Sequence, residues 1–476
     1  MEYRIERDSM GEVRVPADRY WGAQTQRSHE NFPIGVGIET MPAEIIRAFA
    51  VLKKAAAIAN RELLPARMSA EKCALIGRVC DEILAGELDG HFPLVVWQTG
   101  SGTQSNMNVN EVIANRGNEL AGKKLLHPND DVNMSQSSND TFPTAMHIAA
   151  CLAVEDRLLP AVSALEQTLL HLEAENADVL KSGRTHLQDA TPITFAQEIS
   201  GWRTSLARDR ELLTAALPPL RELALGGTAV GTGLNAPDGF DRAVAAAAAE
   251  LTGKPFVTAS NKFHALTSRD ELVFAHGAVK ALACDMMKLA NDVRWLASGP
   301  RTGLGEIAIP ANEPGSSIMP GKINPVMTEV MILACHRVAG NQAGVGFGAF
   351  SGELDLGASS AVPIRSILNS IDILSRSMVL FADKCVKGLS ANAEKCLHTA
   401  ERSTSLATMV SALFGYKIGS RVANLAYEHN LTCREAAERE HLLSHEAADD
   451  LFDLLSLTDV KKTEALFAKY AGIRNV

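Results

Sequence analysis

The side chains with the clearest capacity for chemistry lie in one loop, at positions 315–325, which reads GSSIMPGKINP. The loop brings two serine hydroxyls close in sequence to the ammonium of Lys322, and its glycines leave the backbone free to close over a small molecule. Asn324 is a favourable N-cap and Pro325 a favourable first helical residue, so we expect a helix to begin there. An ammonium beside a helix N-terminus suits an anion, because the unpaired N–H groups and the helix dipole add to its charge.

The spacing of this loop excludes a nucleotide-binding P-loop. That motif needs four residues between its glycines and a serine or threonine directly after its lysine. Here five residues separate Gly315 from Gly321, and Ile323 follows Lys322. The loop therefore predicts a site for a small anion.

Two further polar segments stand directly before helical patterns. They are Ser101-Gly102-Thr103 and Ser137-Ser138-Asn139-Asp140, and both are rich in hydroxyl and amide groups. Either one alone is explained by N-capping of a helix. Together with the 315–325 loop they favour a clamp for a dicarboxylate, whose two charges need donors at both ends.

Composition limits the classes of partner. A formal charge of −10 over 476 residues argues against a nucleic-acid surface, so local positive groups must hold an anionic substrate. No apolar run is long enough to span a bilayer and the N-terminus carries no signal pattern, which leads us to expect a cytoplasmic protein without membrane contact. None of the eight cysteines has CxxC spacing, so we expect no zinc or iron–sulfur site and read them as buried thiols in a reducing compartment.

Hydrophobic periodicity predicts long helices. One apolar seam with alternating steps of three and four residues ends where Ser298-Gly299-Pro300 should break the helix. Two shorter seams repeat the pattern, one of them behind Pro160, which should kink its helix. Seams of this length indicate an all-α fold with a central bundle larger than one chain fills. The seam residues are Leu272, Ala275, Val279, Leu282, Met286, Leu289, Val293 and Leu296; Ile364, Ile367, Ile371, Leu374, Met378 and Phe381; and Val162, Leu165, Leu169 and Leu172.

The loop at 315–325 resembles the signature loop of the fumarase/aspartase superfamily, and further motifs most resemble class II fumarate hydratases. Those motifs are YRIERDSMGEVRVP from Tyr3, TGSGTQSNMNVNEV from Thr99, HPNDDVNMSQSSND from His127, GRTHLQDATPITFAQE from Gly183 and GGTAVGTGLN from Gly226. The resemblance implies a three-domain fumarase/aspartase-like fold, divided into 1–137, a central long-helix domain at 138–394, and a small helical domain at 395–476. It also implies a homotetramer whose active sites are shared between subunits, with no cofactor and no metal.

The resemblance further implies reversible hydration of fumarate to (S)-malate, a tricarboxylic acid cycle reaction. Ser316 matches the base that takes a proton from carbon. His186, paired with Glu329, matches the group that acts through water on the opposite face. The positions that match substrate-binding residues are Ser101, Gly102, Thr103, Ser137, Ser138, Asn139, Thr185, Ser317, Lys322 and Asn324; those that match a secondary anion site are His127, Pro128, Asn129 and Asp130.

Two alternatives stay open on the sequence. An aspartate ammonia-lyase or related amine lyase would share the signature loop, but such enzymes usually carry alanine at Gly321 and different wording around Thr103 and Ser138. A non-enzymatic descendant would be expected to lose the catalytic positions, which are intact. The segment Gly352–Ile364 departs from the superfamily's usual pattern, and it is where a change of substrate preference would first be sought.

Overall fold

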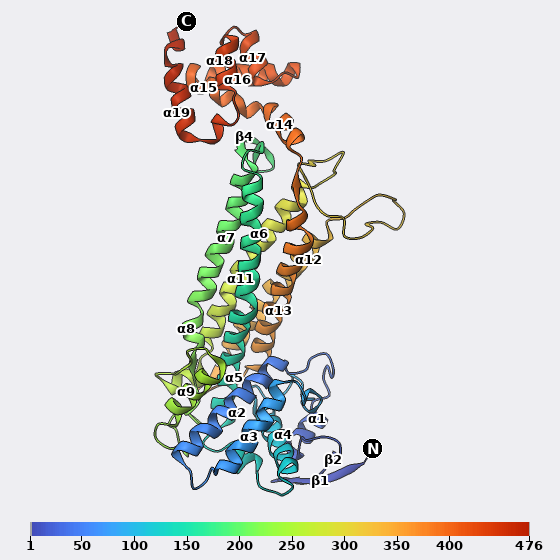
Figure 1. Cartoon of the computed structure of the whole chain (residues 1–476), viewed down its shortest axis with the longest axis vertical. Helices are drawn as coiled ribbons and strands as arrows, with labels where there is room; N and C mark the ends of the chain where they lie inside the picture. The colour runs from blue at the N-terminus through green and yellow to red at the C-terminus, as the bar shows by residue number, and fades with distance from the viewer. Residues whose placement is uncertain (1, 476) are drawn as a thin grey trace. The chain divides into compact units, whose positions relative to one another are not determined.

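The computed structural model describes residues 2–475, which are mostly helical (Figure 1). The chain forms two compact units, each built from three stretches of sequence. The first unit contains the chain up to Pro160, Asp209–Ala283 and Ala334–Ser375, and the second contains Ala161–Arg208, Cys284–Leu333 and the chain from Arg376. Five helices contribute residues to both units: α6 (Leu159–Glu175), α7 (Phe195–Ala215), α11 (Asp270–Leu296), α12 (Val326–Ala349) and α13 (Ala361–Lys384).

The first unit is organised around helix α2, which packs against α3, α5 and α9, while α4 packs against α1, α3 and α5. The side of α2 that faces these helices is almost entirely apolar, so its burial stabilises the unit. Its remaining elements are β1 (Tyr3–Asp8), β2 (Gly11–Pro16), α1 (Ala23–Asn31), α2 (Ala43–Leu63), α3 (Ala70–Leu84), α4 (Thr103–Ala121), α5 (Ser138–Ala153), α8 (Leu217–Leu220), β5 (Glu222–Leu223), α9 (Phe240–Thr252), β6 (Val257–Thr258), α10 (Lys262–Thr267), β8 (Gly352–Glu353) and β9 (Leu356–Gly357).

The second unit contains a helical cluster with its own core near the C-terminus. Apolar residues between Ala400 and Tyr470 pack together there, with Leu180 at the edge of the cluster. The remaining elements of this unit are β3 (Leu180–Thr185), β4 (Gln188–Thr194), β7 (Ile307–Ala308), β10 (Ser390–Ala391), α14 (Ala393–Glu401), α15 (Ala407–Phe414), α16 (Tyr416–His429), α17 (Cys433–Arg439), α18 (His445–Leu451) and α19 (Val460–Lys469).

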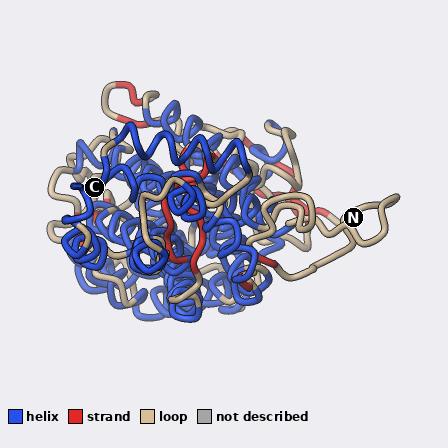
Figure 2. The backbone as a smooth tube through the Cα atoms, turned by 90° about the horizontal axis from the view of Figure 1, so that it is seen from above, coloured by secondary structure: helices blue, strands red, loops and turns tan. Residues whose placement is uncertain are grey.

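Strands are few and short, as the red segments of Figure 2 show. In the described chain they form five two-stranded pairs, of which only β5–β6 is parallel. The β3–β4 hairpin pairs Thr185 with Gln188 at its tip and shifts register between Ser182 and Arg184. The predicted all-α class is confirmed, because no sheet extends beyond two strands within residues 2–475.

The predicted apolar seams are buried along their whole length. Every seam residue of α11, from Leu272 to Leu296, is buried, and so are those of α6 and α13. Helix α11 ends at Leu296, two residues before the predicted break at Ser298. The seams therefore form core, as period-3.5 patterning requires.

The chain around Pro160 is a single irregular helix. A five-residue π-helical segment, Val154–Leu158, joins α5 to α6, and the N–H of Leu159 donates to the carbonyl of Val154. Proline lacks an N–H group and its ring clashes with the carbonyl four residues earlier. A wider π turn directly before Pro160 accommodates both effects, and such turns are a known cause of helix bending.

Candidate active site

The first group of predicted site residues lies at the N-termini of α4 and α5. Thr103 Oγ1 is 3.1 Å from Ser101 Oγ and 3.0 Å from Ser138 Oγ, so three half-buried hydroxyls form one hydrogen-bonded chain. Gly102 caps α4 with a φ of 75°, and a Cβ at this position would lie 2.2 Å from the ring of Phe142. Glycine is required here both by the left-handed backbone and by the packing against Phe142.

The N-terminus of α5 is fixed by a capping box. The Ser137 hydroxyl accepts from the first turn of the helix, and Asp140 Oδ1 accepts from Ser137 N at 2.9 Å. The buried Asp140 also accepts from Gly226 N and Thr228 N, at 3.0 and 2.8 Å. Burial raises the Asp140 pKa to about 6, although its three backbone donors oppose that shift. The Asp140 carboxylate thus joins the GGTAVGTGLN motif to the N-terminus of α5. We call the N-termini of α4 and α5, with the residues directly before them, the α4 and α5 entrances.

Asn139 reaches the same motif from α5. Its Nδ2 donates to the carbonyl of Ala229 at 2.8 Å, and its side chain is half-buried. The structure therefore gathers Ser101, Thr103, Ser138 and Asn139 around two helix N-termini, whose free N–H groups favour an anion.

The atypical segment Gly352–Ile364 contacts the chain directly before α4, at Gly100. The N–H of Ser360 donates to the carbonyl of Gly100 at 3.0 Å, and a Cβ on Gly100 would lie 1.4 Å from the carbonyl oxygen of Ala358. Arg269, which is 5% exposed, donates from Nε to Ser360 Oγ at 3.1 Å and from Nη2 to Gly357 O at 3.2 Å. Burial lowers the Arg269 pKa to about 10, so the guanidinium is still charged at neutral pH. We refer to Arg269, Ser360 and Gly100 as the clasp.

The signature loop is closed at its base. The N–H of Gly315 donates to Lys322 O at 2.9 Å, and Asn324 Nδ2 donates to Gly315 O at 2.8 Å. Helix α12 begins at Val326, one residue later than predicted. The Asn324 side chain, predicted to accept a hydrogen bond as the N-cap, instead donates one to Gly315 O in the loop. The loop carries Ser317 and the Lys322 ammonium exposed at its surface.

Ser316 Oγ lies inside the loop as an acceptor. It receives hydrogen bonds from the N–H groups of Ile318 and Met319, at 3.3 and 3.1 Å. Gly321 turns the chain back with a φ of 82°. Two backbone donors aimed at one hydroxyl oxygen would stabilise negative charge on it.

His186 stands at the tip of the β3–β4 hairpin. His186 and Leu187 are the two central residues of the turn and have φ values of 55° and 59°, the left-handed region that non-glycine residues rarely occupy. Below the tip, the buried Lys181 pairs with Glu198 and Glu306 at 2.9 and 3.4 Å, which anchors the hairpin. The strained turn displays Thr185 and His186 in the open, where both are exposed.

Glu329 is exposed on the first turn of α12. Within residues 2–475 no hydrogen bond or ion pair joins Glu329 to His186, or either of them to Ser316. The predicted pair of His186 and Glu329 is therefore not formed inside one described chain.

The predicted secondary anion site is a self-capped turn. His127 Nδ1 accepts from Asn129 N and Asp130 N, at 3.3 and 3.2 Å, and lies 3.3 Å from the Asp130 carboxylate. Pro128 begins the π-helical turn Pro128–Val132. The side chains of His127, Asn129 and Asp130 are exposed, while the backbone N–H groups of Asn129 and Asp130 are already bonded to His127.

Comparison with known proteins places this chain in a family. A family model described as lyase matches residues 11–340. The class II fumarate hydratases of Bacillus cereus and Bacillus subtilis are each 53% identical to it, over 95% of this chain and 98% of theirs. This chain belongs to the class II fumarate hydratase family. The crystal structure of class II fumarase from Schistosoma mansoni superposes with a TM-score of 0.93 and 38% identity, covering 96% of this chain and 99% of that one.

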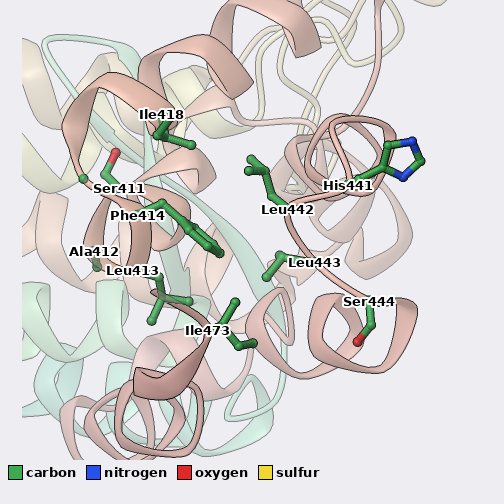
Figure 3. A pocket seen from close by; sticks show the side chains of 11 residues that line it. Ser411, Ala412, Leu413, Phe414, Ile418, His441, Leu442, Leu443, Ser444 and Ile473 are labelled. Atoms are coloured by element: carbon green, nitrogen blue, oxygen red, sulfur yellow. The ribbon is translucent and has the colours of Figure 1, made fainter. Parts of the chain in front are cut away.

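One cavity in the second unit of this family member is not part of the predicted site. It has a volume of about 920 Å³ and lies among the C-terminal helices α15 and α16, and none of the predicted site residues line it. Figure 3 shows Phe414, Leu443 and Ile473 converging on it, while the ring of His441 points away. None of the residues that line it is a lysine or an arginine, so it offers no fixed positive charge to a dicarboxylate.

One cluster of a histidine and two carboxylates has ligand atoms close together. In the described chain, His264, Asp270 and Glu271 are the group of side chains close enough to share a metal ion. His264 already lies 3.3 Å from Asp270 and 3.7 Å from Glu271, and these contacts account for the arrangement.

Among residues 2–475, every helix is too short or too polar to cross a membrane.

The sequence did not predict a role for three buried charged residues near the α4 and α5 entrances. Lys53 and Arg269 were not identified at all, and Asp140 was not expected to bind the backbone of Gly226 and Thr228. Asp140 carried a recognisable signal, because it completes the Ser-x-x-Asp spacing of a capping box with Ser137. Lys53 also carried one, since it shares a helical face with Phe49 and Ala56, where only apolar residues are expected. Arg269 carried no local signal, because its partners lie about ninety residues away in sequence.

Proposed function

We propose that this chain catalyses the reversible hydration of fumarate to (S)-malate. The observation that supports it most is the hydroxyl chain of Ser101, Thr103 and Ser138 at two helix N-termini, in a member of the class II fumarate hydratase family. Hydroxyl donors and helix N-termini bind a dianion. An uncharged site of this kind is also compatible with a neutral water as the second reactant.

In the direction of dehydration, Ser316 takes the proton from the carbon next to a carboxylate. A serine hydroxyl is a weak base unless its alkoxide is stabilised, and the N–H groups of Ile318 and Met319 are aimed at Oγ for that purpose. The carbanion delocalises into a dianionic carboxylate, which Lys322 and Asn324 stabilise electrostatically. In the hydration direction Ser316 returns the proton to the same carbon.

The hydroxyl group leaves from the opposite face. Hydroxide is a poor leaving group, so it needs a proton, which His186 supplies through a bound water while Glu329 holds the charge and tautomer of the imidazole. Thr103, Ser138, Asn139 and Thr185 hold the rest of the substrate, together with Ser101, Gly102, Ser137 and Ser317. His127, Pro128, Asn129 and Asp130 form a secondary anion site.

We further propose a homotetramer whose active sites are shared between subunits. In the described chain no hydrogen bond or ion pair joins Glu329 to His186, or either of them to Ser316, and this supports the proposal because these groups must meet around one substrate. The enzyme would work in the cytoplasm, in the tricarboxylic acid cycle.

We also propose that the reaction needs no metal or other cofactor. Exhaustive chelation should leave the rate unchanged, and loss of turnover that one added metal restores would contradict metal independence.

The alternative, an aspartate ammonia-lyase, differs in its leaving group. A departing ammonium is already protonated and needs no acid, whereas hydroxide needs the proton that His186 and Glu329 would supply. We expect kcat/KM on aspartate to be at least about a thousandfold below that on malate, about 4 kcal/mol of discrimination.

Fumarate incubated with concentrated ammonium decides between the two reactions when both products are quantified. Malate should dominate. Aspartate as the main product would overturn the hydratase proposal and direct attention to Gly352–Ile364.

A further inference from the structure

Lys53 is a fully buried lysine that the mechanism does not use. It lies in α2 with no exposed surface, on the same helical face as Phe49 and Ala56. Burying an ammonium costs several kcal/mol unless it is fully hydrogen-bonded. A lysine buried at such a position therefore needs acceptors for all of its N–H groups.

Three amide oxygens converge on the Lys53 ammonium. Its Nζ donates to Asn106 Oδ1 at 2.7 Å, to Gln136 Oε1 at 2.9 Å and to Asn133 Oδ1 at 3.1 Å. Three acceptors match the three N–H donors of an ammonium, whereas a neutral amine has only two. The geometry is that of a protonated lysine.

The orientation of each amide is set by its own donors. Asn106 Nδ2 donates to Asn133 Oδ1, Asn133 Nδ2 donates to the carbonyl of Gln136, and Gln136 Nε2 donates to the carbonyls of Val132 and Met134. No carboxamide can be reversed without losing these bonds. These bonds fix the orientation of each carboxamide around the Lys53 ammonium.

These partners belong to both helix entrances. Asn106 lies one turn after Thr103 in α4, and Gln136 directly precedes Ser137, the N-cap of α5. Thr141 of α5 also donates to Asn106 Oδ1, at 3.1 Å. One ammonium thus connects α2 to the first turns of the two helices that carry Thr103 and Ser138.

The ionisable groups that act on Lys53 are Asp140 of α5 and Cys80 of α3. Burial lowers the Lys53 pKa to about 7, and Asp140 opposes this shift. Burial raises the Cys80 pKa to about 12, which keeps that thiol neutral. The Asp140 carboxylate is therefore the group whose charge favours the protonated form of Lys53.

We propose that Lys53 is a positioning residue, whose ammonium fixes the spacing between the α4 and α5 entrances at which one carboxylate of the substrate binds. The inference rests on the proposed function of these entrances. Lys53 acts through Asn106 and Gln136 and does not touch substrate. It should therefore contribute to binding in the ground state and the transition state alike, which appears in KM and not in kcat.

The test is Lys53→Met, which keeps the length of the side chain and removes its charge and donors. We expect KM for fumarate to rise at least about tenfold while kcat changes less than about threefold. Ile45→Ala, a buried substitution on the same helix, is the matched control. It should lower the melting temperature without moving KM, and an equal rise in KM in the control would overturn the proposal.

Gln136→Met keeps the proposal testable if Lys53→Met does not fold. Gln136 is only half-buried, and its loss should raise KM in the same direction by a smaller factor. If Lys53→Met does fold, the rise in KM in the double variant should be smaller than the product of the two single rises, because both residues act through one network. An unchanged KM, or fully multiplicative effects, would refute the role of Lys53.

A failure of the proposed function would be recognised separately, because the wild-type chain would then not consume fumarate at all. In that event the thermal shift produced by succinate reads dicarboxylate binding directly. A shift that Lys53→Met reduces would support the inference for whichever dicarboxylate the site takes. An equal shift in both proteins would overturn it.

Discussion

At the scale of the residue, the proposed mechanism gives Ser316 its most demanding role, the removal of a proton from carbon. Its Oγ accepts two backbone N–H bonds, and its side chain contributes little to the core because the loop around it is exposed. Ser316→Ala should lower kcat by about 10²–10⁴-fold, the usual scale for a positioned acid or base. The melting temperature should not change. Near-normal turnover would remove Ser316 from the role of base.

His147 predicts an acid sensitivity of folding. It is 8% exposed, its Nδ1 donates to Glu222 O at 2.8 Å, and burial lowers its pKa to about 4. The unfolded chain protonates this imidazole near its ordinary pKa of 6.5, whereas the folded chain does so only near 4. Stability is therefore fully present above pH 6.5 and is lost as the pH falls toward 4, by about 3 kcal/mol in all.

His147→Gln keeps a donor for Glu222 O but cannot gain a proton. Melting curves between pH 4 and 7.5 should show a shallower acid decline for the variant than for the wild type. Parallel declines would show that other groups control acid unfolding.

The residues at the α4 and α5 entrances could be predicted from sequence, because the helical patterns that follow them mark where each helix begins. Ser101, Thr103 and Ser138 precede helical patterns, and the structure brings their hydroxyls together. Lys53 and Arg269 could not be placed in this way, because their partners come from other elements and a single sequence does not report such pairings.

At the scale of the element, the clasp fixes where α4 begins. The carbonyl of Ala358 occupies the space that a side chain at Gly100 would need. Gly100→Ala should cost at least about 2 kcal/mol of folding free energy, since a backbone atom cannot move aside cheaply. It should also raise KM, because Ser101 and Thr103 follow directly. Chemical denaturation and steady-state kinetics measure the two effects.

Gly77→Ala is the matched control for this prediction. Gly77 lies inside α3, and a Cβ there would meet only the Lys54 side chain, at 3.8 Å. Alanine should stabilise the helix by about 0.5–1 kcal/mol and leave kinetics unchanged. If both glycine variants behaved alike, the clasp would have no special role.

The long helices were the elements most accessible to sequence reasoning, because seams such as that of α11 repeat over many turns. The β3–β4 turn was not. Two-residue hairpin turns with positive φ at both positions normally announce themselves with glycine or asparagine, and this one uses His186 and Leu187. The division into domains at 137 and 394 stays a prediction.

At the scale of the whole molecule, the second unit leaves large apolar side chains uncovered on its long helices. Leu333 of α12 is 66% exposed, and Trp295, Val330, Val379 and Leu380 are exposed as well. Apolar surface gathered on bundle helices is expected to be covered by other chains. It favours the proposed tetramer, whose mass would be four times 51.0 kDa.

Shared sites predict complementation between two inactive variants. Ser316→Ala and His186→Asn chains, carrying different affinity tags, should each be inactive as pure tetramers. Hybrids isolated through both tags should regain activity, because some sites then receive an intact Ser316 and an intact His186 from different chains. Hybrids that contain both tags yet stay inactive would contradict sharing of the site.

The central claim is that fumarate gains a proton and a water from opposite faces. Hydration of fumarate in deuterium oxide, followed by proton NMR of the product, tests it most directly. We predict (S)-malate with a single deuterium on the carbon next to the hydroxyl-bearing one, as one diastereomer in which deuterium and hydroxyl were added anti. A syn product, a mixture of diastereomers, or no malate at all would contradict the placement of Ser316 and His186 on opposite faces of the substrate.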